Sequence, residues 1–132
     1  MSSGRSLSLE RVRSYLRRSE ELLRQAGDLL RSNEVAKASE MLWGSAVNAV
    51  MAYAATKGRA LTSHGEMKEF VKQLAVETGD EEIWRTFEDV AEALHANFYH
   101  EFLEPATVLA KMREVEAFNR KIGELVERAL RG

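Results

Sequence analysis

Hydrophobic residues near the start of the chain recur every three or four positions, which predicts an amphipathic helix over about residues 9–31. Ser8 precedes this stretch and is suited to cap the N-terminus of the helix. The inward stripe consists of Val12, Leu16, Ser19, Leu22, Leu23, Ala26 and Leu30. From residue 34 to about residue 57 almost every face is apolar or small, a pattern typical of a central helix, and Gly58 is suited to end it.

Capping residues divide the middle of the chain. Ser63 and Glu66 have the S-x-x-E spacing of a capping box, which predicts a third helix over about residues 64–77. Gly79 is expected to end this helix, and Asp80 is expected to cap the next one. The buried stripe predicted for the fourth helix consists of Ile83, Phe87, Val90, Leu94 and Phe98.

Pro105 cannot continue the fourth helix but is suited to the first turn of another. The last helix has an inward stripe of Val108, Met112, Val115, Ile122, Leu125 and Ala129. No segment alternates in the way a β-strand does. We therefore predict one all-α domain over residues 1–132, an up-and-down bundle of about five helices. Its first ~8 residues are expected to be flexible, as chain termini commonly are.

The composition narrows the possible functions. The chain has no Cys, which excludes a disulfide framework, a thiolate metal site and a cysteine nucleophile. A net charge of -2 and a pI near 6.0 argue against a general nucleic-acid coat, so any nucleic-acid contact must use a local patch. The charged fraction of 30% is above average and weakly favours a thermophile.

Several kinds of segment and motif are missing from the sequence. No stretch approaches the ~18 uninterrupted apolar residues of a membrane span, and the N-terminus lacks the apolar segment of a signal peptide. We therefore expect a soluble, cytoplasmic protein without a membrane partner. The P-loop, the dinucleotide-binding glycine pattern and the nucleophile elbow are absent too, and we expect no cofactor.

Three stretches of the chain resemble one family. They are EMLWGSAVNAVMAYAATKG, SHGEM at the start of the third helix, and the charged EFVKQLAVETGDEEIWRTF that leads into LHANFY near the end of the fourth. Over about residues 10–128 the chain resembles the archaeal PaREP family, a branch of the HEPN-like (higher eukaryotes and prokaryotes nucleotide-binding) helical-bundle superfamily. The W-G-S-A and L-H-A-N-F-Y pieces are the most specific parts of the match.

The resemblance implies a bundle built around two long antiparallel helices, and frequent homodimers. It also implies links to nucleotides and to nucleotidyltransferase partners in toxin–antitoxin pairs. Many superfamily members cleave RNA without a metal. The second helix has small residues at every seventh position (Ala38, Ser45 and Ala52), which allow another helix to approach closely. A contact within the chain satisfies that pattern as well as a dimer does, but we expect a homodimer because two-fold assemblies are the commonest oligomers.

The stretch ALHANFYHEF contains two of the three histidines. At about 100° per residue, His95 lies at one edge of the buried stripe near Glu92 and Tyr99, whereas Asn97 and His100 lie toward the other side. Histidines that share a metal on one helix usually stand four residues apart, so no metal site is expected here.

His95 is the candidate catalytic residue, because a histidine can act as base and then acid when a ribose 2′-hydroxyl attacks the adjoining phosphate. In the cleaving HEPN proteins that the chain resembles, an arginine stands a few residues before the histidine. The corresponding positions here are Glu88, Asp89 and Val90, and carboxylates would repel a phosphate. The alternative is that His95 is a structural histidine, bonded to Glu92 or to a neighbouring helix.

The loop before the third helix is the candidate phosphate site. Lys57, Arg59, Ser63 and His64 gather at a helix N-terminus, where free amides and the helix dipole favour an anion. Ordinary capping by Ser63 with solvated basic side chains explains the same residues. In the fourth helix, Asn97 and His100 are further ligand candidates.

Together with these candidate residues, the resemblance implies a HEPN-like module that binds a nucleotide or RNA, within a toxin–antitoxin or nucleotidyltransferase-partner system. One alternative is a metal-independent ribonuclease that uses His95 with an arginine from elsewhere, such as Arg59. The other is a purely structural protein-interaction partner. Turnover of RNA distinguishes the ribonuclease from the binding module, and a requirement for a partner chain distinguishes the structural protein.

Overall fold

A computed structural model describes residues 2–132, with side chains from Ser8 onward. Its elements are α1 (Ser2–Arg31), α2 (Val35–Thr56), α3 (His64–Thr78), α4 (Glu81–Arg85), the π-helix η1 (Thr86–Ala91), α5 (Glu92–His100) and α6 (Pro105–Arg131). No strand is present in residues 2–132. The backbone stays helical from α4 through η1 into α5, so these three elements form one continuous rod. The predicted all-α bundle of about five helices is confirmed.

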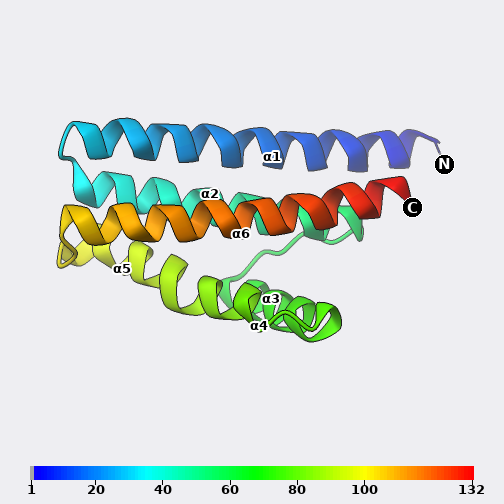
Figure 1. Ribbon diagram of the computed structural model, residues 1–132. Helices are drawn as coiled ribbons and strands as arrows, with labels where there is room; N and C mark the ends of the chain where they lie inside the picture. The colour runs from blue at the N-terminus through cyan, green and yellow to red at the C-terminus, as the bar shows by residue number, and fades with distance from the viewer. Residues whose placement is uncertain (1) are drawn as a thin grey trace.

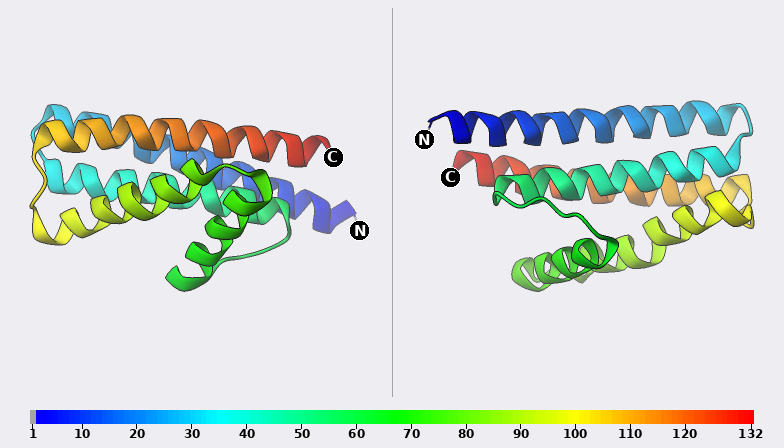
Figure 2. Two further views of the ribbon diagram at one scale, coloured as in Figure 1. Left: turned by 60° about the horizontal axis from the view of Figure 1, so that its bottom comes forward. Right: turned by 180° about the vertical axis from the view of Figure 1, so that it is seen from behind.

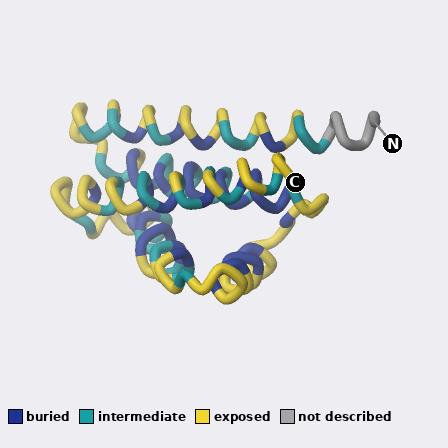
Figure 3. Tube along the Cα trace, turned by 45° about the vertical axis from the view of Figure 1, so that its right-hand side comes forward, coloured by how far each residue is buried: buried dark blue, intermediate teal, exposed yellow. Residues whose placement is uncertain are grey.

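The helices alternate in direction along the bundle (Figure 1). The elements α1, α2, the α4–η1–α5 rod and α6 run up and down in turn, while α3 packs against α4 at one side (Figures 1 and 2). Helix α2 contacts α1, α5 and α6, and its buried positions lie inside the bundle (Figure 3). The prediction that the most apolar helix is central is therefore confirmed.

The predicted helix boundaries are set by the expected capping groups. Ser63 accepts a hydrogen bond from the backbone N–H of Glu66 at 3.1 Å, which starts α3. Gly79 ends α3 in the left-handed conformation with φ of 67°, and the side chain of Asp80 caps α4. Pro105 occupies the first turn of α6. These boundaries depend on local chemistry, which is why sequence alone identifies them.

The predicted start of the first helix is wrong. Helix α1 begins at Ser2 rather than near Leu9, so Ser8 lies inside the helix and is not its N-cap. Extending an existing helix adds one hydrogen bond for each residue that is fixed, so a polar N-terminal segment can continue it at little cost. Met1 lies outside the described residues, and the flexibility expected for the first residues stays a prediction.

The stripe predicted for the fourth helix is correct except at its end. Phe98 is exposed (37%), whereas its neighbour Asn97 is completely buried. Asn97 donates to the Ser39 hydroxyl at 2.7 Å and accepts from the Leu103 N–H at 2.6 Å, which ties the end of α5 to α2. A search for apolar spacing cannot find a buried residue whose burial depends on hydrogen bonds.

A polar network joins three helices in the core. The Ser19 hydroxyl donates to the backbone carbonyl of Ser45, and the Ser45 hydroxyl donates to the backbone carbonyl of Ser19, both at 2.7 Å. The Asn119 amide donates to the Ser45 hydroxyl at 2.9 Å. The small-residue face of α2 is therefore used within the chain, where α1 crosses closely enough that a Cβ on Gly44 would lie 3.0 Å from Leu22.

Candidate functional site

Helices α2, α3 and α5 each contribute two polar or aromatic side chains to one cluster. Residues three or four apart on a helix share a face, so each helix presents its pair on one side. The set, which we call the Trp43 cluster, consists of Glu40 and Trp43 from α2, His64 and Lys68 from α3, and Glu92 and His95 from α5. The site thus depends on the packing of all three helices.

His95 is held from two directions. Its Nδ1 lies 2.9 Å from Oε1 of Glu40, and its ring stacks on Trp43 with centroids 5.0 Å apart and planes at 29°. The Tyr99 ring meets it edge-on at 5.4 Å. Because a carboxylate only accepts, Nδ1 donates and a neutral imidazole keeps Nε2 as its acceptor. Glu40 therefore fixes the tautomer and orientation of a histidine whose side chain is 36% exposed.

His64 forms the second histidine–carboxylate pair. Its Nε2 lies 2.5 Å from Oε1 of Glu92, and Lys68 Nζ lies 3.4 Å from the same oxygen. The ring centroids of His64 and Trp43 are 5.4 Å apart. Trp43 therefore contacts both imidazoles, and each imidazole has its own carboxylate.

The cluster contains three acidic or basic side chains besides its two imidazoles. They are Glu40, Glu92 and Lys68. Each carboxylate contacts one imidazole, and Lys68 also contacts Glu92.

A groove of about 380 Å³ opens beside the cluster, which is within the ~300–1,000 Å³ range of small-molecule sites. Its apolar and aromatic wall includes Tyr15, Trp43, Val47, Met51, Leu61 and Met67, and its polar wall includes Asn48, Thr62, Ser63 and His64. Ser63 accepts from the Glu66 N–H, whereas the first amides of a helix have no acceptor within it. The groove therefore combines an aromatic surface with an anion-favouring helix N-terminus.

The family comparison matches the model of the archaeal PaREP1/PaREP8 family to residues 14–119, a span that contains the whole Trp43 cluster. The chain belongs to this family. The predicted PaREP resemblance is thus confirmed, and the HEPN-like relationship stays a prediction. A comparison of the chain with curated proteins found no match. None of its described helices is long and apolar enough to cross a membrane.

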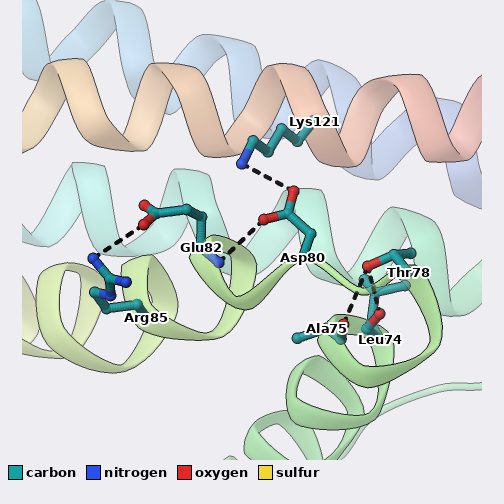
Figure 4. A network of polar contacts seen from close by, with 7 residues as sticks. All are labelled: Leu74, Ala75, Thr78, Asp80, Glu82, Arg85 and Lys121. Carbon is teal, nitrogen blue, oxygen red and sulfur yellow. Dashed lines mark hydrogen bonds and ion pairs between the residues drawn. The ribbon is translucent and has the colours of Figure 1, made fainter.

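In this PaREP1/PaREP8 chain, the α3–α4 hairpin that supplies His64 is attached to α6 by an ion pair. Asp80 Oδ2 lies 3.0 Å from Lys121 Nζ (Figure 4). Within the hairpin, Glu82 pairs with Arg85 at 3.0 Å and the Thr78 hydroxyl donates to the Leu74 carbonyl at 2.8 Å. The hairpin lies on the side of the bundle away from α1 (Figure 2), and of these contacts the Asp80–Lys121 pair is the one that links it to another helix.

Only part of the predicted phosphate site is assembled. Ser63 and His64 line the groove, whereas Lys57 and Arg59 lie outside its walls. Lys57 Nζ is 5.4 Å from the centroid of the Tyr53 ring, and the Arg59 guanidinium is 5.2 Å from that of Phe70. Both cations therefore pack over aromatic rings that are not part of the groove wall.

The two remaining ligand candidates lie apart from the groove. Asn97 uses its side-chain oxygen and nitrogen to hold Leu103 and Ser39, so a ligand would have to break hydrogen bonds of the fold. His100 is exposed at the last residue of α5. The geometry favours a structural role for Asn97.

Sequence reasoning missed Glu40, Trp43 and Lys68 as site residues. Trp43 stands three residues after Glu40, and Lys68 stands four after His64, spacings that place each pair on one helical face. Nothing local in the sequence indicates that these faces meet. Within the described residues, no group of three or more histidine, aspartate or glutamate side chains is arranged to hold a metal ion.

Glu66 borders the groove and has a perturbed carboxyl group. The Thr62 hydroxyl donates to its Oε1 at 2.7 Å, and this hydrogen bond, helped by the Thr62 backbone N–H, lowers the pKa of Glu66 below its usual value. Hydrogen bonds to a carboxylate favour its charged form. Glu66 therefore holds the loop that forms the polar wall.

Proposed function

We propose that this PaREP1/PaREP8 chain is a HEPN-like binding module for a nucleotide or RNA, and that the groove beside the Trp43 cluster is its ligand site. The observation that supports this function best is the position of Trp43. Its ring contacts His64 and His95 and also forms part of the groove wall. A base placed in the groove would have an aromatic surface against it, which is how proteins commonly hold bases.

The polar wall suits the phosphate of the same ligand. Ser63 and His64 stand at the start of α3, where the free amides and the helix dipole favour negative charge. Lys68 follows His64 by one turn and is the cation nearest to Glu92 in the cluster. A nucleotide would thus lie with its base toward α2 and its phosphate toward α3.

Fluorescence tests this proposal because the chain has two tryptophans, of which only Trp43 lines the groove. In Trp84→Phe, adenosine monophosphate should quench the remaining tryptophan, and in Trp43→Phe it should have no such effect. The nucleotide should also raise the melting temperature of both variants, because a ligand that binds the folded state stabilises it. Unchanged fluorescence and melting temperature at millimolar nucleotide would rule out the proposal.

A metal-independent ribonuclease is the second candidate, and the pairing of His95 with Glu40 favours it. A histidine fixed by a carboxylate is suited to take the proton of a 2′-hydroxyl and return it to the leaving oxygen. Lys68, which contacts Glu92, is the lysine of the cluster, whereas Arg59 packs over Phe70. Cleavage of RNA in the presence of a chelator, lost in His95→Ala, would support this activity, and intact RNA would exclude it.

Assembly and cellular setting are part of the proposal. The PaREP resemblance favours a cytoplasmic homodimer that works with a nucleotidyltransferase in a toxin–antitoxin system. A purely structural role in such a pair is the alternative without a ligand. Light scattering of the purified chain would distinguish a dimer from a 14.9 kDa monomer.

A further inference from the structure

The aromatic rings of the site continue beyond the groove to the surface. From His64 to Trp43, from Trp43 to His95, and from His95 to Tyr99, successive ring centroids are 5.4, 5.0 and 5.4 Å apart. Phe98 then meets Tyr99 edge-on at 5.1 Å. One row of contacting rings therefore leads from the groove to the C-terminal end of α5.

The outer end of this row is open to solvent. Tyr99 is 66% exposed and Phe98 is 37% exposed, and Phe102, which follows α5, is 56% exposed. Large aromatic side chains that stand together on a surface usually mark an interaction site. Tyr99 forms no part of the buried core, so the stability of the bundle does not explain its position.

A polar side chain lies between the groove and Tyr99. His95 lies between Trp43 and Tyr99, and its Nδ1 contacts Glu40. His64 stands at the groove end of the row, on the other side of Trp43, and Lys68 contacts the same carboxylate as His64. A strand that lies along the row from the groove to Tyr99 would therefore pass His95.

We propose that the ligand is a single-stranded oligonucleotide of at least two bases, with one base in the groove and the next stacked on Tyr99. This inference rests on the proposed function and adds a second base site to it. Every base has a π-face, so stacking on an exposed ring tolerates any sequence. Exposed aromatic residues also bind protein partners. A protein partner would not need the groove, whereas the row of rings leads into it, and this favours the oligonucleotide.

The test compares adenosine monophosphate with an adenosine dinucleotide whose first ribose carries a 2′-O-methyl group. The methyl group prevents attack by that oxygen, so only binding is measured. The wild-type chain should bind the dinucleotide on the order of tenfold more tightly or more, which is the effect of one stacked base. Tyr99→Ala should remove this gain and leave the affinity for the mononucleotide unchanged, and Tyr99→Phe should keep the gain because it keeps the ring.

The outcomes separate the two proposals. The second base site would be overturned if Tyr99→Ala bound the dinucleotide as tightly as the wild type does. It would also be overturned if the wild type bound both ligands equally. Neither result would contradict ligand binding in the groove. Failure of both ligands to bind would overturn the proposed function as well. Loss of self-association in Tyr99→Ala, with unchanged nucleotide binding, would identify the exposed rings as a protein interface and would also overturn the inference.

Discussion

The core network of Ser19, Ser45 and Asn119 and the Trp43 cluster both place polar side chains between helices. The core network uses hydroxyl and amide groups, which stay neutral, and both serines are buried. The Trp43 cluster uses imidazoles, carboxylates and an ammonium, all of them partly exposed. Neutral hydrogen-bonding groups can be buried when they find partners, whereas ionisable groups need water or partners. Both serine hydroxyls and the Asn119 amide nitrogen find partners, and within the described residues Asn119 Oδ1 is buried without one. The neutral core network is suited to align the helices, and the partly exposed Trp43 cluster is suited to contact a ligand.

The largest loss of stability is expected from Ser45→Val. The valine would add volume at the close contact of α1 and α2 and would remove the hydroxyl that bonds Ser19 and Asn119. We expect the free energy of unfolding to fall by about 2–4 kcal/mol. Urea unfolding followed by circular dichroism measures this loss. A variant as stable as the wild type would show that the network does not stabilise the helix contact.

Asn97→Ala should have the next largest effect, because it leaves the Leu103 N–H without its acceptor and removes the amide that donates to the Ser39 hydroxyl. The expected cost is about 1–3 kcal/mol of unfolding free energy. His100→Ala is the control, since His100 is exposed at the last residue of the same helix and should change stability by about 0.5 kcal/mol or less. Equal costs at the two positions would contradict the role of Asn97 in holding α5 to α2.

His64→Ala should affect binding more than stability. His64 is exposed, and its contact with Glu92 contributes about 1 kcal/mol or less. Its loss should weaken adenosine monophosphate binding roughly tenfold, the effect of one hydrogen bond to a charged group. Gln73→Ala, an exposed position on the same helix, is the control. Calorimetric titration of both variants measures the affinities, and wild-type affinity in His64→Ala would remove this residue from the site.

Glu66→Gln should give the smallest effect, visible only in the pH dependence of stability. Hydrogen bonds from Thr62 lower the pKa of Glu66 in the folded chain from the usual 4.5. The stability that the Glu66 carboxylate contributes to the fold is therefore present above its pKa in the unfolded chain. It is lost as the pH falls through the lowered pKa of the folded chain. Unfolding of both proteins at a series of pH values below about 6 measures the difference. Parallel curves for the two proteins would show that the Thr62 contact contributes nothing.

The fold could largely be predicted because its determinants are local. Apolar spacing identified the central helix, and Ser63, Gly79, Asp80 and Pro105 set boundaries through contacts within a few residues. The error at the end of the fourth helix arose where burial has another cause. Asn97 is buried because of hydrogen bonds to a residue 58 positions away and to the loop that follows it.

The site could be predicted only in part because its contacts are distant in sequence. His95 meets Glu40 across 55 residues, and His64 meets Glu92 across 28. The sequence identified His64, Ser63 and His95 as candidates from their chemistry and helix positions. It could not identify Trp43 as the residue that joins them, because an apolar helix face contains no information about which helix covers it.

The most direct test of the nucleotide-binding proposal is to locate the ligand by nuclear magnetic resonance. Adenosine monophosphate should shift the indole N–H resonance of Trp43 and the methyl resonances of Met51 and Met67, which line the groove. The base protons should show magnetisation transfer to these groups. The indole N–H of Trp84, which lies in α4, should not move. Shifts confined to residues outside the groove, or no shifts at millimolar nucleotide, would contradict the account.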